Sequence, residues 1–252
     1  MANSLVISAI VTTTLVFAVL AGRWLRPVLK EEQLSGDSKD AVKFAMGLVA
    51  TMSALLLGLL VSSAKGNYDE TRDRVIQMAS KVGFLDRLLS LYGPETSGVR
   101  HELRGVIADA AGRLWPDDEH VAAELRPNEQ AGDAFFKALQ ALTPQDDGQR
   151  TLKAQIMSLA VELGELRTLL QAQAIPSVSM TMLVVVICWL VVIFFTSSML
   201  APPNAVTAVA LIAAGVSVSA ALFLILELDQ PFNGLLHVSG APVLAALSRM
   251  VP

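Results

Sequence analysis

The chain has 252 residues, of which 53% are hydrophobic and 17% are charged, and its mean hydropathy is +0.54. This composition indicates a membrane protein rather than a soluble enzyme. The formal net charge of -4 excludes the basic footprint of a nucleic-acid-binding protein, so we expect no nucleic-acid partner. The one cysteine, Cys188, excludes an intramolecular disulfide.

Residues 3–22 form an uncharged run long enough to cross a hydrocarbon core about 30 Å thick, and they predict a first span, TM1. A cleaved signal peptide is the alternative, because small residues lie near a cleavage point at 19–21. However, no Lys or Arg precedes the apolar run, which favours a retained span. Residues 23–43 then predict a short polar loop, with Trp24 as an interfacial anchor.

Residues 44–64 predict a second span, TM2, in which Ala54, Gly58 and Ser62 recur at every fourth position. These three small residues therefore share one face of a helix. The face has two interpretations: a surface on which another helix packs closely, or a weakly polar stripe that faces a pore.

Residues 65–175 predict an extramembrane antiparallel helical bundle that is continuous with TM2 and with the third span. Four amphipathic segments, 65–92, 99–114, 130–142 and 152–170, are joined by short polar connections. The first and last carry apolar seams with steps of three and four residues. The seams consist of Val75, Met78, Val82, Leu85, Leu89 and Tyr92, and of Leu152, Ile156, Leu159, Leu163, Leu166 and Leu170.

Residues 178–200 and 205–226 predict a third and a fourth span, TM3 and TM4, joined by about four residues as a tight hairpin. Residues 227–252 begin with Glu227 and Asp229, continue into a turn, and end in an apolar segment too short to span, which we expect to lie along the membrane interface or against the bundle. The expected fold is therefore all-α, with four transmembrane helices and a helical bundle inserted between TM2 and TM3.

Four spans place both termini and the bundle on one side of the membrane. The basic residues Arg23, Arg26 and Lys30 draw the first loop toward the cytoplasm, whereas basic residues just after TM2 draw the bundle there. The two counts oppose each other, so both orientations remain open.

The chain resembles the bestrophin-like family of four-span membrane proteins of bacteria and plants. The run 228–234 is similar to that family's Leu-Asp-Arg-Pro-Phe-x-Gly signature, with Pro231, Phe232 and Gly234 at the matching turn positions and Gln230 in place of Arg. The stretches 68–70 and 85–89, the dipeptide 115–116 and the approach 167–176 to TM3 are also similar.

The resemblance implies a distant likeness to bestrophins, which are pentameric anion channels with four spans and a cytosolic helical domain. It therefore implies a ring-shaped homo-oligomer, passive ion conduction, a cytoplasmic bundle and residence in a bacterial plasma membrane. The aromatic constrictions and acidic calcium clasp of bestrophins do not map onto this chain residue by residue.

No nucleophile motif, phosphate loop or metal-ligand spacing is present, so we expect no catalytic, cofactor-binding or metal-binding residue. His101, His120 and His237 lie in three different segments, where an exposed or capping role is more typical than metal binding. The acidic run 117–119 has two interpretations: a site that attracts a cation or, more typically, a solvated loop or the first turn of a helix. Glu227 and Asp229 are the candidate mouth of an ion pathway. Their alternative role is interfacial anchoring, with Asp229 capping the Pro-Phe turn.

The sequence thus favours an oligomeric bestrophin-like ion channel or pore that conducts an inorganic ion across the lipid bilayer. An enzyme is disfavoured because the spans lack paired ionisable residues. The alternative is a membrane-anchored structural or signalling module whose bundle binds a protein partner of unknown identity.

Overall fold

The computed structural model describes residues 2–28, 36–116, 123–124, 128–173, 177–202 and 204–250. Within these ranges the protein is helical and has no strand, which confirms the predicted fold class. The acidic run 117–119, His120 and the dipeptide 175–176 lie outside the described residues. The helices are α1 (Ala2–Leu25), α2 (Gly36–Tyr92), α3 (Ser97–Leu114), α4 (Glu129–Ala141), α5 (Asp147–Gln173), α6 (Met180–Leu200), α7 (Ala205–Leu228) and α8 (Ala241–Arg249), with short 3-10 turns η1 (Arg26–Val28) and η3 (Pro94–Thr96).

The chain divides into two compact units. Unit 1 comprises Met1–Gly66 and Pro176–Asp229, and unit 2 comprises Asn67–Ile175 and Gln230–Pro252. Among the described residues, four helices are long and apolar enough to cross a membrane: Ser4–Val28, Gly36–Tyr92, Met180–Leu200 and Ala205–Leu228. The chain is therefore an integral membrane protein.

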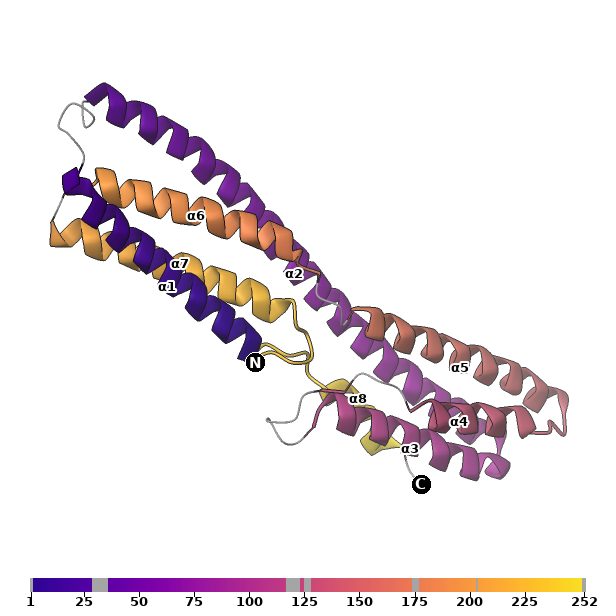
Figure 1. Ribbon diagram of the computed structural model, residues 1–252. Coiled ribbons are helices and arrows are strands. Elements are labelled where there is room, and N and C mark those ends of the chain that lie inside the picture. The colour runs from indigo at the N-terminus through magenta and orange to yellow at the C-terminus, as the bar shows by residue number, and fades with distance from the viewer. Residues whose placement is uncertain are drawn as a thin grey trace. The chain divides into compact units, whose positions relative to one another are not determined.

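In unit 1, α1 packs against both α6 and α7 (Figure 1). Ser4 of α1 donates a hydrogen bond to Glu227 at the end of α7, while Arg23 Nη1 donates to the carbonyl of Asn204 at the start of α7, 3.2 Å away. Helices α1 and α7 are therefore antiparallel. These contacts place the end of α1 beside the short α6–α7 connection, as four alternating spans require.

The contact between α1 and α6 depends on a glycine. A Cβ built on Gly22 would overlap the backbone oxygen of Phe195 and lie 3.1 Å from Cβ of Ser198. Ser198 Oγ in turn donates to the carbonyl of Val19 at 2.6 Å. Such close backbone approach is what small residues permit between helices in lipid.

The apolar part of α2 is the least covered of the four spans. Only 11% of its most apolar window is buried within one copy of the chain, compared with 28% in each of the other three spans. Leu60 and Ala64 are buried with the other helices of unit 1, whereas Phe44 and Leu55 are more than 70% exposed. The first part of α2 stands apart from α1, α6 and α7 in Figure 1.

The core of unit 2 is built largely from the two predicted seams. Val82, Leu85, Leu89 and Tyr92 of α2 are buried in one cluster with Ile156 of α5. The same cluster includes Val99 and Leu103 of α3 and Phe135 and Leu139 of α4. Burying each large apolar side chain contributes about 1.5–3 kcal/mol, so the seams account for much of the stability of unit 2.

The bundle was expected to continue into TM3, but α5 ends at Gln173 and Ser177–Ser179 are not helical before α6 begins at Met180. Pro176 supplies the reason, because it lacks an N–H and disfavours helix in the residue before it. The apolar tail contains the helix α8, in which Pro242 lies in the first turn, where proline is tolerated.

Candidate functional site

Glu227 lies in the last turn of α7 and is only 1% exposed. Its carboxylate accepts a hydrogen bond from the hydroxyl of Ser4, which is also 1% exposed. A buried carboxylate requires such partners because its desolvation is costly. Within a single copy of the chain, Glu227 therefore joins the beginning of α1 to the end of α7.

Asp229 follows α7 directly and is 4% exposed. Its Oδ1 accepts hydrogen bonds from the backbone N–H of Ser177 at 2.8 Å and from the Ser177 hydroxyl at 2.6 Å. The N–H of Val178 also donates to both carboxylate oxygens at 3.2 Å. Asp229 thus caps the non-helical residues before α6. The sequence had suggested that it caps the Pro-Phe turn instead.

The small residues Ala54, Gly58 and Ser62 are all exposed in one copy. No described atom outside the helix lies within 4 Å of a Cβ built on Gly58. The buried face of α2 in unit 1 consists instead of Ser53, Leu60 and Ala64. The described helices of the same chain therefore leave the small-residue face uncovered, and both interpretations of it, packing face and pore face, stay predictions.

The signature turn packs against Trp115 of unit 2. Pro231, Phe232 and Gly234 are buried, and the Phe232 ring meets the Trp115 ring edge-on with centroids 6.3 Å apart. Trp115 Nε1 donates to the carbonyl of Val238 at 2.7 Å. Trp115-Pro116 and the run 228–234 were both noted in the sequence, and the structure brings Trp115 and Phe232 together.

No group of three or more potential metal ligands occurs among the residues that the structure describes. His101 is exposed on α3 and His237 is exposed in the segment before α8. The acidic run 117–119, which the sequence analysis weighed as a cation site, lies outside the described ranges.

Sequence inspection missed a polar cluster in unit 2. Arg113 hydrogen-bonds to Asp109, and this bond lowers the pKa of the Asp109 carboxyl. Both side chains line a cavity of about 660 Å³ between α3, α4 and α5, together with the half-buried Arg167, whose pKa is lowered by burial. The i,i+4 spacing of Asp109 and Arg113 was a visible signal of their pairing, but Arg167 is distant in sequence.

A second pair also escaped the sequence analysis. Asp86 of α2 accepts hydrogen bonds from Arg100 of α3, with Nε at 2.8 Å and Nη2 at 3.1 Å. This contact raises the pKa of the Arg100 guanidinium, chiefly through the hydrogen bond to Asp86. Both side chains border a groove of unit 2.

Comparison with known proteins gives one family. Residues 13–243 match the model of the bestrophin-like domain, a stretch that includes the second half of α1, all of α2, α6 and α7, and the whole region between them. No curated protein and no solved structure matches the chain. Because the family model matches far more than half of the sequence, this integral membrane protein belongs to the bestrophin-like family.

Proposed function

We propose that the protein is an oligomeric ion channel or pore in which α2 repeats around a central axis. The observation that carries the proposal is the coverage of α2: its apolar segment is the least buried span in a single copy. Membership of the bestrophin-like family supports the same function. The conducted species is a small inorganic ion, and we propose no catalytic step and no cofactor.

The exposed surface of α2 carries the small and hydroxyl side chains expected of a helix that packs against its own copies and lines an ion pathway. Thr51, Ser62 and Ser63 are exposed there, in addition to the small residues Ala54 and Gly58. Thr51 Oγ1 donates to the carbonyl of Gly47 at 2.9 Å, which makes the hydroxyl compatible with an apolar setting. Small residues allow neighbouring helices to approach closely, and hydroxyls offer a weakly polar wall.

Glu227 and Asp229 enter the proposal as the candidate mouth of the pathway. Each is buried and hydrogen-bonded in a single copy, so an ion would reach them only through a change in the contacts with Ser4 or Ser177. We further propose that the homo-oligomer resides in a bacterial plasma membrane.

The test is ion flux from liposomes that contain the purified full-length protein. Chloride and potassium efflux are measured beside empty liposomes, for the wild type, Gly58→Trp and Val209→Trp. Val209 is 67% exposed on α7 and is the matched control. We expect flux from the wild type and from Val209→Trp, and strongly reduced flux from Gly58→Trp, because the large ring occupies the exposed face of α2.

The double variant Glu227→Gln/Asp229→Asn tests the mouth in the same assay. A changed ratio of chloride to potassium flux supports the assignment, and an unchanged ratio removes these residues from the pathway. Absence of flux from folded wild-type protein would refute the channel and favour the alternative, a membrane-anchored module whose bundle binds a partner.

A further inference from the structure

Unit 2 contains a groove between α2 and α8 that none of the functions above uses. It has a volume of about 850 Å³, within the range of small-molecule sites. Small residues of both helices line it, among them Ala79 and Gly83 of α2 and Ala246 of α8. A Cβ built on Gly83 would meet no described atom within 4 Å, so the space above this glycine is open.

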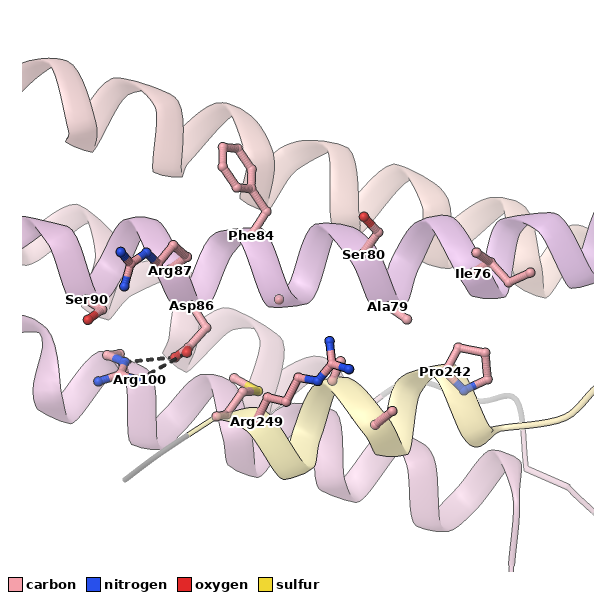
Figure 2. Close-up of a pocket in the computed structure, with 14 residues that line it drawn as sticks. Ile76, Ala79, Ser80, Phe84, Asp86, Arg87, Ser90, Arg100, Pro242 and Arg249 are labelled. Atoms are coloured by element: carbon pink, nitrogen blue, oxygen red, sulfur yellow. Dashed lines mark hydrogen bonds and ion pairs between the residues drawn. The ribbon is translucent and has the colours of Figure 1, made fainter.

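The charges that line this α2–α8 groove are three arginines and one aspartate: Arg87, Arg100, Arg249 and Asp86. Asp86 is bound by both Nε and Nη2 of Arg100, and the two side chains are only 12% and 22% exposed. Figure 2 shows this pair bridging α2 and α3 beside the groove. The one carboxylate of the groove is therefore already matched by one guanidinium.

The guanidinium groups of Arg87 and Arg249 are not paired with a carboxylate of the groove. The guanidinium groups of Arg87 and Arg249 make no hydrogen bond and no ion pair within the part of the chain that the structure describes. In Figure 2, Arg249 extends from α8 into the space next to α2, and Arg87 lies on α2 near the Asp86–Arg100 pair. Among the described residues that line it, the groove thus carries two formal positive charges in excess.

We propose that the α2–α8 groove binds a phosphate-bearing anion through Arg87 and Arg249. Charge, hydrogen-bonding geometry and space each favour a ligand that bears a phosphate group. A phosphate monoester carries about -1.5 to -2 charges at neutral pH, which matches the excess charge of the groove. The planar guanidinium fork pairs with phosphate oxygens in a bidentate manner. The small-residue lining leaves room for the group that bears the phosphate.

A soluble phosphorylated metabolite and a phospholipid headgroup offer the same chemistry. Neither source depends on whether α2 lines a pore, so the proposal stands apart from the proposed channel. The two sources are separated by the probes, which are inorganic pyrophosphate and phosphatidic acid.

The experiment uses the full-length protein in nanodiscs of phosphatidylcholine, with pyrophosphate binding measured by isothermal titration calorimetry at low salt. The variants are Arg87→Gln, Arg249→Gln and Gly83→Leu, with Arg72→Gln as the control. Arg72 is an exposed arginine of α2 outside the groove, and Arg87 and Arg249 are exposed too, so these charge variants should fold. Circular dichroism checks the helix content of each.

We expect each groove arginine to contribute about tenfold to the affinity, since a charge-assisted hydrogen bond contributes roughly that much. Gly83→Leu should weaken binding without a change of charge, because its side chain enters the open space. Arg72→Gln should bind like the wild type. This pattern identifies a soluble phosphate ligand.

In the second arm, the amount of phosphatidic acid that co-purifies with the detergent-solubilised protein is measured for the same variants. Retention that falls with Arg87→Gln and Arg249→Gln, but not with Arg72→Gln, identifies a lipid headgroup as the source. If neither probe binds, or if Arg72→Gln weakens binding as much as the groove variants do, the proposal is wrong.

Discussion

At the scale of single residues, the structure shows which buried polar groups have hydrogen-bond partners and which do not. Asp229 holds two backbone N–H groups and one hydroxyl with a single carboxylate. Tyr92 presents the opposite case, because its hydroxyl is buried and has no hydrogen-bond partner in the described part of the chain. The carboxylate of Asp229 therefore stabilises the fold through its hydrogen bonds, whereas Tyr92 stabilises it through the packing of its ring and not through its hydroxyl.

The substitution Asp229→Asn should destabilise unit 1 by about 1.5–3 kcal/mol, since hydrogen bonds to a charged group contribute that much. Thermal unfolding can be followed by far-ultraviolet circular dichroism, because every regular element of the described chain is helical. The control is Asp40→Asn, whose side chain is 76% exposed and whose ion pair with Lys43 should contribute little. Equal melting temperatures for the two variants would contradict the capping role.

The substitution Tyr92→Phe should stabilise unit 2 by about 1 kcal/mol, because it removes an unsatisfied buried hydroxyl. Slower hydrogen exchange of core amides in α2 and α5 would show the effect, whereas faster exchange would contradict it.

The same tyrosine predicts a pH dependence. Burial raises the pKa of Tyr92 above its ordinary value of 10.0. The free energy of unfolding is therefore independent of this titration below pH 10.0 and falls as the pH rises through the higher pKa of the folded state, because the folded protein disfavours the phenolate. The chain has two tyrosines, so the difference in phenolate absorbance between wild type and Tyr92→Phe isolates this titration. A midpoint at or below pH 10.0 would refute the prediction.

At the scale of elements, glycines separate tight helix contacts from open helix surfaces. Gly22 of α1 faces the backbone of α6 with no room for a methyl group, whereas a Cβ on Gly47 of α2 would meet no described atom within 4 Å. In unit 2, a Cβ on Gly240 would lie 2.5 Å from Cδ2 of Trp115. The approach to α8 and the contact of α1 with α6 therefore both require glycine.

The substitution Gly22→Ala should lower the stability of unit 1 by about 1–3 kcal/mol, the usual cost of overpacking, because the atom it meets is backbone rather than a flexible side chain. Gly47→Ala is the control, and it should be neutral or stabilise α2 by up to about 1 kcal/mol through helix propensity. Thermal unfolding followed by circular dichroism measures both, and a Gly22→Ala protein as stable as Gly47→Ala would disprove the close contact.

At the scale of the whole molecule, the uneven coverage of the spans is the main observation. Helices α1, α6 and α7 bury more of their apolar windows than α2 does. The exposed α2 surface is compatible with lipid along its apolar side chains, and its small residues suit contact with a second copy of the chain.

We therefore expect Ser62→Cys, placed in a Cys188→Ala background, to form covalent dimers with a short bismaleimide in the membrane. Val209→Cys in the same background is the control, because Val209 is exposed on α7 outside the proposed contact. Absence of Ser62→Cys dimers, or equal dimer yields from both positions, would argue against contact between α2 helices of neighbouring copies.

Local patterns in the sequence were sufficient for the number of spans, the seams of unit 2 and the family. Each depends on neighbouring residues: an apolar run long enough to cross a bilayer, steps of three and four along α2 and α5, or a short signature run such as 228–234. Hydropathy and helical periodicity are properties of a segment, so they can be read without knowing what the segment contacts.

Tertiary structure decided which side chains meet. It placed Glu227 against Ser4, Asp229 against Ser177 and Phe232 against Trp115, and it gathered Arg87, Arg100 and Arg249 around one groove. These partners are far apart in the chain, and their proximity follows from how whole helices pack rather than from any local spacing. For the same reason, the sequence marked Glu227 and Asp229 as notable charges, but only the fold showed that both are buried and hydrogen-bonded.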